Sequence, residues 1–107
     1  MDVALRALAD PRRRQILALV HDRELPAGEI AGRFDVTRPA ISQHLTVLRE
    51  AGLVIERRQG TRRLYRARLA GAAELRQWLE SFWDEGLARM QAAAEAEERN
   101  GRTDDDH

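Results

Sequence analysis

The sequence contains no cysteine and no lysine, and aromatic residues make up only 5% of its 107 residues. Without cysteine the chain can form neither a disulfide nor a thiolate metal site, and it offers no thiol nucleophile. With so few aromatics, the core has to be built mainly from alanine, leucine, valine and isoleucine, which favours packed helices over stacked sheets. We therefore expect a mainly α-helical protein of a single domain.

Targeting and catalytic signals are also lacking. No apolar run approaches the length of a membrane-spanning helix, and Met1 is not followed by a basic and then an apolar segment, so we expect a cytoplasmic protein without a membrane partner. There is no glycine-rich phosphate loop, and the three histidines are scattered, whereas catalysis needs acid, base or nucleophile groups that converge in a pocket. We therefore predict no enzyme activity, no catalytic residue and no cofactor.

The formal net charge is zero, but the charges are unevenly distributed. Residues 1–68 hold 14 arginines against 8 acidic residues (+6), whereas residues 69–107 hold 4 arginines against 10 acidic residues (−6). The basic part is therefore the part that could contact nucleic acid. A GC-rich genome explains the exclusive use of arginine, although arginine is also better suited than lysine to bidentate contact with guanine or phosphate.

Hydrophobic spacing and capping residues predict four short helices in the basic part. A first helix ends near Leu8, and a second begins at Asp10-Pro11, because aspartate is a good N-cap and proline is favoured at the first helical position. Leu25-Pro26 breaks the pattern before a short helix over residues 27–34. Asp35-Val36 is the turn into the next helix, which Thr37 caps and whose apolar stripe is Ile41, Leu45 and Leu48.

The rest of the chain changes character at Val54. Residues 54–68 consist of short β-like runs around Gln59-Gly60-Thr61, which predicts a hairpin. Beyond Gly71 a long helix is expected to end at Asn100-Gly101. We thus predict one domain over residues 1–99 and a disordered acidic tail over residues 100–107.

Residues 27–51 have the order of a helix-turn-helix, in which a short helix braces a second one against the major groove. Glutamine can pair with adenine and arginine with guanine, so Arg38, Ser42 and Gln43 are the main candidates for base readout. Any amphipathic helix of a soluble protein also has a polar outer face, and His44 could equally brace the helix or contact DNA. The predicted double-stranded DNA contacts are Thr37, Arg38, Pro39, Ser42, Gln43, His44, Thr46, Arg49, Arg57, Arg58, Arg62 and Arg63.

Arginines bracket the hairpin turn, and Arg66 and Arg68 follow on the return strand. Beside phosphates each of them can release counterions and add to affinity, and an arginine at the tip can enter a minor groove. The alternative is a charged edge that only discourages strand aggregation.

Several segments together resemble the ArsR-type (ArsR/SmtB) winged-helix repressors over residues 3 to about 90. They are Leu8-Ala9-Asp10-Pro11-Arg12-Arg13, Ile16-Leu17, Ile41-Ser42-Gln43-His44-Leu45-Thr46-Val47-Leu48-Arg49-Glu50-Ala51-Gly52-Leu53-Val54 and Gly60-Thr61-Arg62-Arg63-Leu64-Tyr65. The resemblance implies a winged helix-turn-helix with five helices and one β-hairpin wing, a homodimer joined by its first and last helices, and binding to inverted-repeat operators. The pattern Trp78-Leu79-x-x-Phe82-Trp83 is similar to a subgroup without metal sites whose members often repress their own operons.

The last predicted helix has an apolar face too broad for one neighbour. One edge of it can cover the domain's own core and the other can pair with a second copy. The predicted dimer contacts are Val3, Leu5, Leu8, Leu75, Trp78, Leu79, Phe82, Trp83 and Met90. The alternative is an antitoxin-like interaction module whose last helix binds a different protein.

Metal sensors of this family commonly use a Cys-x-Cys pair on the short helix before the recognition helix, or Asp and His on the last helix. Residues 27–32 offer no thiolate, and the last helix has Glu80, Asp84 and Glu85 but no histidine. We therefore predict no metal site. The sequence specifies neither the operator nor a small-molecule inducer.

Overall fold

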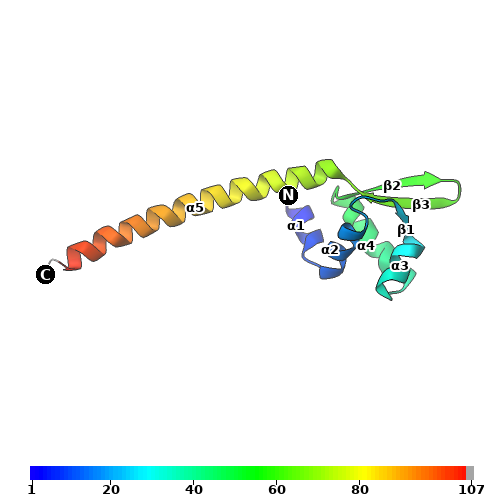
Figure 1. Cartoon of the computed structure of the whole chain (residues 1–107), viewed down its shortest axis with the longest axis horizontal. Helices are drawn as coiled ribbons and strands as arrows, with labels where there is room; N and C mark the ends of the chain where they lie inside the picture. Colours follow the sequence, from blue (N-terminus) through cyan, green and yellow to red (C-terminus); the bar gives the residue numbers. More distant parts are fainter. Residues whose placement is uncertain (106–107) are drawn as a thin grey trace. The chain divides into compact units, whose positions relative to one another are not determined.

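The computed structural model describes residues 1–105 and, over that range, contains five helices and three short strands (Figure 1). This confirms the predicted mainly α winged helix-turn-helix. Residues 1–75 form one compact unit, and the described residues from 76 onward form a second one, which consists of the rest of α5. In chain order the elements are α1 (Asp2–Leu8), α2 (Pro11–Leu19), β1 (Leu25–Pro26), α3 (Ala27–Phe34), α4 (Arg38–Glu50), β2 (Val54–Gln59), β3 (Arg62–Ala67) and α5 (Leu69–Asp105).

Asp10 joins α1 to α2 as predicted. Its carboxylate accepts hydrogen bonds from the backbone amides of Arg12 at 2.7 Å and Arg13 at 3.4 Å, and Nε of Arg13 donates to the carbonyl of Ala7 at 2.5 Å. Desolvation raises the pKa of the Asp10 carboxyl, but the two amide hydrogen bonds and the positive charges of His44 and Arg13 outweigh it, so this pKa lies below its ordinary value. The cap therefore stabilises the fold above the ordinary aspartate pKa and loses that effect as the pH falls through the lowered one.

The turn between α3 and α4 sets the angle of the helix-turn-helix. Asp35 ends α3 in the left-handed conformation, with φ of 52° and ψ of 44°, and its amide donates to the carbonyl of Ala31. Thr37 then caps α4 by accepting a hydrogen bond from the amide of Ala40 at 3.3 Å, and Pro39 lies in the first turn, where a missing N–H costs nothing. The sequence-based boundaries of these two helices are confirmed.

The core of residues 1–75 is aliphatic. The predicted stripe on α4 is buried, with Ile41 and Leu48 at 0% exposure and Leu45 at 1%. These side chains pack with Ile16 of α2 and Ile30 of α3, both fully buried. Among the described residues no polar or charged residue is buried. Hydrophobic contact alone thus fixes which face of α4 points outward.

The sheet is antiparallel with strand order β1-β3-β2. The hairpin is confirmed: Gln59 pairs with Arg62 across a two-residue turn in which Gly60 has φ of +62°. The strand β1 departs from the sequence-based expectation, in which Leu25-Pro26 is only a break between helices. Two residues show no alternation, and they become a strand because Leu25 pairs with Tyr65 of β3.

A close glycine contact joins α4 to α5. Gly52 follows the end of α4 with φ of +74°, and a Cβ atom on Gly71 would overlap the carbonyl oxygen of Gly52. The same carbonyl accepts a hydrogen bond from Nη1 of Arg68 at 3.2 Å. α5 begins at Leu69, earlier than predicted, and its first turn packs directly on the turn that follows the recognition helix.

The far end of α5 differs from the sequence-based expectation. The helix continues through Asn100-Gly101, where the sequence predicts its end, as far as Asp105. Each of these two residues lowers helix propensity by only about 1 kcal/mol or less, and neither blocks a helix as proline does. Residues 100–105 of the expected disordered tail are therefore helical, and residues 106–107 lie outside the described part of the chain.

Candidate nucleic-acid interface

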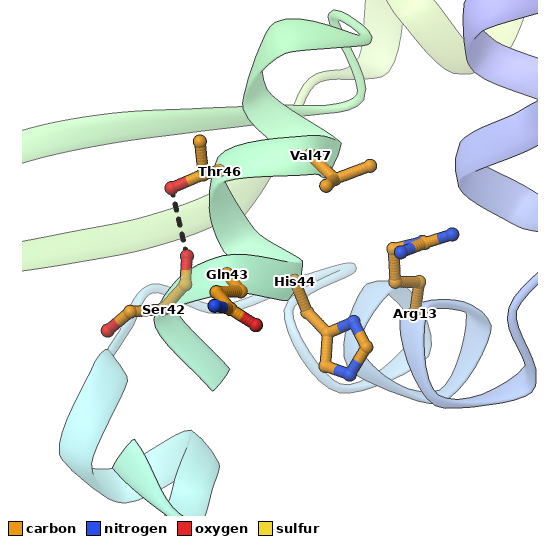
Figure 2. Close-up of a pocket in the computed structure, with 6 residues that line it drawn as sticks. All are labelled: Arg13, Ser42, Gln43, His44, Thr46 and Val47. Carbon is orange, nitrogen blue, oxygen red and sulfur yellow. Dashed lines mark hydrogen bonds between the residues drawn. The ribbon is translucent and has the colours of Figure 1, made fainter. Parts of the chain in front are cut away.

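The outward face of α4 carries the polar side chains expected to read bases. Ser42, Gln43 and Thr46 are exposed, and His44 is half-buried on the flank. Figure 2 shows these residues around a hollow of about 500 Å³ that also includes Val47 and, from α2, Arg13. The Thr46 hydroxyl donates to the carbonyl of Ser42 at 2.9 Å, so its proton is engaged within the helix and its methyl group and lone pairs remain for a ligand.

A second hollow, of about 730 Å³, connects the recognition helix to the wing β2–β3. Arg38 from the start of α4 and Arg62 and Arg63 from the wing line it, together with the hydroxyl-bearing residues Ser42 and Thr61. Ser42 borders both hollows. From the sequence, only the family resemblance places the recognition helix beside the wing. The structure brings the cationic and hydroxyl groups of both elements around one concave surface.

Acidic residues pair with most of the wing arginines, and sequence analysis missed these partners. The Nε atom of Arg57 lies 2.8 Å from Oε2 of Glu24, and the side-chain nitrogen Nη2 of Arg62 lies 4.0 Å from Oε1 of Glu29. Among the described side chains, those of residues 1–101, no carboxylate forms an ion pair with Arg58 or Arg38. Exposed pairs of this kind contribute only about 0–1 kcal/mol, so DNA phosphates can replace the carboxylates at low cost.

The pairs around Glu56 are different because one carboxylate accepts two hydrogen bonds and also forms an ion pair with a second arginine. Nη1 of Arg49 lies 2.7 Å from Oε2 of Glu56, the hydroxyl of Tyr65 donates to the same oxygen at 3.3 Å, and Nε of Arg63 lies 3.7 Å from Oε1. Burial of Tyr65 and the neighbouring charge and hydrogen bond of Glu56 together raise the pKa of its phenol. Two predicted DNA contacts, Arg49 and Arg63, are therefore held by a residue that no sequence motif singles out.

The residues predicted for a dimer leave much apolar surface uncovered in one chain. Phe82 and Trp83 are each 55% exposed and Met90 is 62% exposed. The rings of Trp78 and Phe82 stack with centroids 5.4 Å apart, and Trp83 meets Phe82 edge-on at 6.2 Å. Within residues 1–75, Val3 is exposed, Leu5 is half-buried, and Leu8 and Leu75 line an apolar hollow of about 410 Å³. Leu79 is also exposed on α5.

The described part of the chain contains neither a metal-binding cluster nor a membrane span. Among the side chains that the structure describes, those of residues 1–101, no group of three or more His, Asp or Glu is arranged to hold a metal ion. No helix in the same range has the length and apolar character needed to span a membrane.

Comparison with known proteins identifies the family. Residues 10–56 match the model of the bacterial regulatory protein arsR family. Over 86 residues the chain is 46% identical to the HTH-type transcriptional regulator Rv2034 of Mycobacterium tuberculosis, covering 80% of each protein. The chain belongs to the ArsR family. This ArsR-family chain is also 31% identical to the transcriptional repressor SdpR of Bacillus subtilis, covering 80% of the chain and 96% of the relative.

Solved structures confirm the winged helix-turn-helix of the ArsR family. An ArsR-like transcriptional regulator from Rhodococcus sp. RHA1 aligns with a TM-score of 0.72 and 32% identity, covering 87% of this chain and 91% of that one. A homodimeric winged helix-turn-helix DNA-binding domain from Mycobacterium bovis aligns with a TM-score of 0.65 and 34% identity, covering 78% of each. This ArsR-family protein is therefore a DNA-binding transcriptional regulator and not an enzyme, with α4 as recognition helix and β2–β3 as wing.

Proposed function

We propose that this ArsR-family regulator is a cytoplasmic homodimeric repressor that binds an inverted-repeat operator, its own promoter included, without control by a metal. The observation that carries the proposal is the concave surface on which α4 and the wing converge. There Arg38 and Ser42 of the recognition helix lie with Arg62 and Arg63 of the wing around one hollow. An inserted helix and a flanking arginine-rich hairpin are what major-groove reading and backbone anchoring require.

The two parts of this surface have different roles in the proposal. Arg38, Ser42 and Gln43 read base edges in the major groove, because Arg38 can donate to guanine and the other two side chains can both donate and accept. Exposed wing arginines bind phosphates, which carry no sequence information. Thr37, Pro39 and Thr46 complete the contact surface of α4, and His44 lies at its flank.

A homodimer follows from the geometry of DNA and from the exposed face of α5. One recognition helix reads only a few base pairs, and a second copy one helical turn away raises the effective concentration at its half-site. The exposed aromatic side chains Phe82 and Trp83 are typical of a surface that another protein surface buries. The homodimeric relative from Mycobacterium bovis supports a second copy of the chain as that partner.

The proposal is tested by purifying the chain alone and sequencing the DNA that it retains from sheared genomic DNA. We expect palindromic sites, its own promoter among them, and a dimer by sedimentation at micromolar concentration. Repression is then tested with a reporter, since the relatives include the repressor SdpR of Bacillus subtilis and the activator HlyU of Vibrio cholerae. A monomer that retains no DNA would contradict the proposal and favour an interaction module.

Metal independence gives a direct prediction. Zinc, cadmium or arsenite at stoichiometric concentration should leave operator affinity unchanged, and a chelator should have no effect, because the described side chains form no metal-binding cluster and the chain has no thiolate. Fluorescence anisotropy on a labelled operator measures this. A tenfold loss of affinity on adding metal, reversed by chelation, would overturn it and point to Glu80, Asp84 and Glu85 as ligands.

A further inference from the structure

Glu56 lies at the base of the wing, where one carboxylate serves both the recognition helix and the hairpin. Its side chain is only 17% exposed, although it lies on a strand whose later residues are exposed. Its oxygens face Arg49 from the last turn of α4, and Tyr65 and Arg63 from β3. The side chain thus joins the end of the reading helix to the strand that carries the wing arginines.

We infer that Glu56 is a specificity-determining residue, an internal counterion that holds Arg49 and Arg63 in the positions where operator phosphates meet them and keeps them from adapting to other DNA. This inference rests on the proposed DNA contacts of those two arginines. Glu56 touches no DNA in this proposal and acts through its partners.

The physical reason is preorganisation. A guanidinium has five N–H donors in a rigid fork, so Arg49 can keep its 2.7 Å contact with Glu56 and still present donors to a phosphate. Held in this way, the arginines can bond only to DNA phosphates that lie where α4 places them when it is docked in the major groove. Released, they can follow any backbone, since long side chains otherwise adapt freely and phosphate contacts are independent of sequence.

The partial burial of the carboxylate strengthens this constraint. An arginine that left Glu56 for a badly placed phosphate would leave a poorly solvated negative charge beside the polyanion, at a cost in desolvation and repulsion. On DNA of arbitrary sequence, no base contact offsets the cost of an arginine leaving Glu56. On the operator the phosphates meet the arginines where Glu56 holds them, so this cost does not arise. Glu56 therefore penalises the wrong ligand, as specific recognition generally requires.

The other two wing pairs provide a contrast and a control. The Glu29 side chain is 56% exposed and lies 4.0 Å from Arg62, and Glu24 is 30% exposed and pairs with Arg57 alone. Neither carboxylate connects two elements of the DNA-binding surface through several donors. Glu29→Gln removes the same charge from the same surface as Glu56→Gln but without a shared hydrogen-bond cluster, so it measures the effect of charge by itself.

The test compares wild type, Glu56→Gln, Glu56→Asp and Glu29→Gln on the operator and on a random duplex of equal length, by anisotropy over a range of salt. For Glu56→Gln we expect about fivefold tighter binding to random DNA, and on that DNA a slope of log affinity against log salt that is steeper by about one unit. Operator affinity should stay within about twofold of wild type. Glu56→Asp, which keeps the charge but shortens the reach, should also lower the ratio of operator to random affinity. Glu29→Gln should change both affinities by the same factor.

A spectroscopic readout confirms that the cluster is altered in a folded protein. The chain has a single tyrosine, so the ultraviolet absorbance of its phenolate reports on Tyr65 alone. In Glu56→Gln the negative charge that helps to raise the pKa of Tyr65 is gone and a neutral amide oxygen replaces the carboxylate acceptor, so that pKa should fall relative to wild type while the circular dichroism stays unchanged. A variant that loses operator and random binding equally would reduce Glu56 to a structural residue and overturn the inference.

Two outcomes separate this inference from the proposed function. If the wild-type chain does not prefer its operator over random DNA, the proposed function fails. If the wild type shows that preference and Glu56→Gln and Glu56→Asp both retain it, or if Glu29→Gln reproduces their effects, only the role of Glu56 fails.

Discussion

Phe82→Asp is expected to abolish operator binding at concentrations where the wild-type chain saturates the operator. Phe82 is 55% exposed in the single chain and stacks on Trp78 within the apolar face of α5. On dimerisation the new carboxylate would lose its water without gaining a cationic partner, and this desolvation costs several kcal/mol. Without a dimer, each recognition helix binds its half-site alone and the benefit of a high effective concentration disappears.

Sedimentation at micromolar concentration checks this result together with operator anisotropy. Gln77→Asp is the matched control, because Gln77 is exposed and lies about 140° around the helix from Phe82, so it adds the same charge away from the apolar face. It should remain a dimer and bind the operator. A wild-type chain that sediments as a 12.2 kDa monomer and still binds a palindromic site tightly would contradict the dimer, and α5 would then need another partner.

Base reading and phosphate anchoring should fail in different ways. Gln43→Ala removes an exposed side chain from the outward face of α4 and should cost about 1–3 kcal/mol on the operator and little on random DNA. The double variant Arg62→Ala with Arg63→Ala should weaken both kinds of DNA and lower the salt slope by about one unit for each phosphate that an arginine no longer neutralises.

Both variants are measured on the operator and on random duplexes over the same salt range. An operator with one substituted base pair at the predicted position is the internal control, since Gln43→Ala should tolerate it better than wild type does. Equal weakening on specific and random DNA for Gln43→Ala would falsify its role in base readout and assign that role to Arg38 or Ser42.

Local signals suffice for much of the fold because they depend on near neighbours in the chain. Asp10 and Thr37 cap helices through amides two or three residues away, and Ile41, Leu45 and Leu48 share a face through helical periodicity. The hairpin likewise follows from its turn residues. The predicted end of α5 is wrong because Asn100 and Gly101 weaken a helix without blocking it.

The candidate site can be predicted only in part. Its polar residues on α4 and its wing arginines follow from the sequence, and the family model and relatives confirm the kind of protein that carries them. Their role as DNA contacts stays a prediction. The acidic partners escape sequence reasoning because a lone glutamate such as Glu24, 33 residues before Arg57, gives no local signal of the pairing.

The sequence by itself thus determined the helix-turn-helix, the hairpin and the segregation of basic from acidic residues, since short-range capping, periodicity and turn chemistry specify each of them. Only the tertiary structure decided that Leu25-Pro26 becomes an edge strand of the sheet, that Arg38 and Arg63 face one hollow, and that Glu56 joins α4 to β3. These features depend on which surfaces the buried core around Ile41 and Leu48 brings together. Such contacts between distant residues arise from packing the whole unit, so no local pattern encodes them.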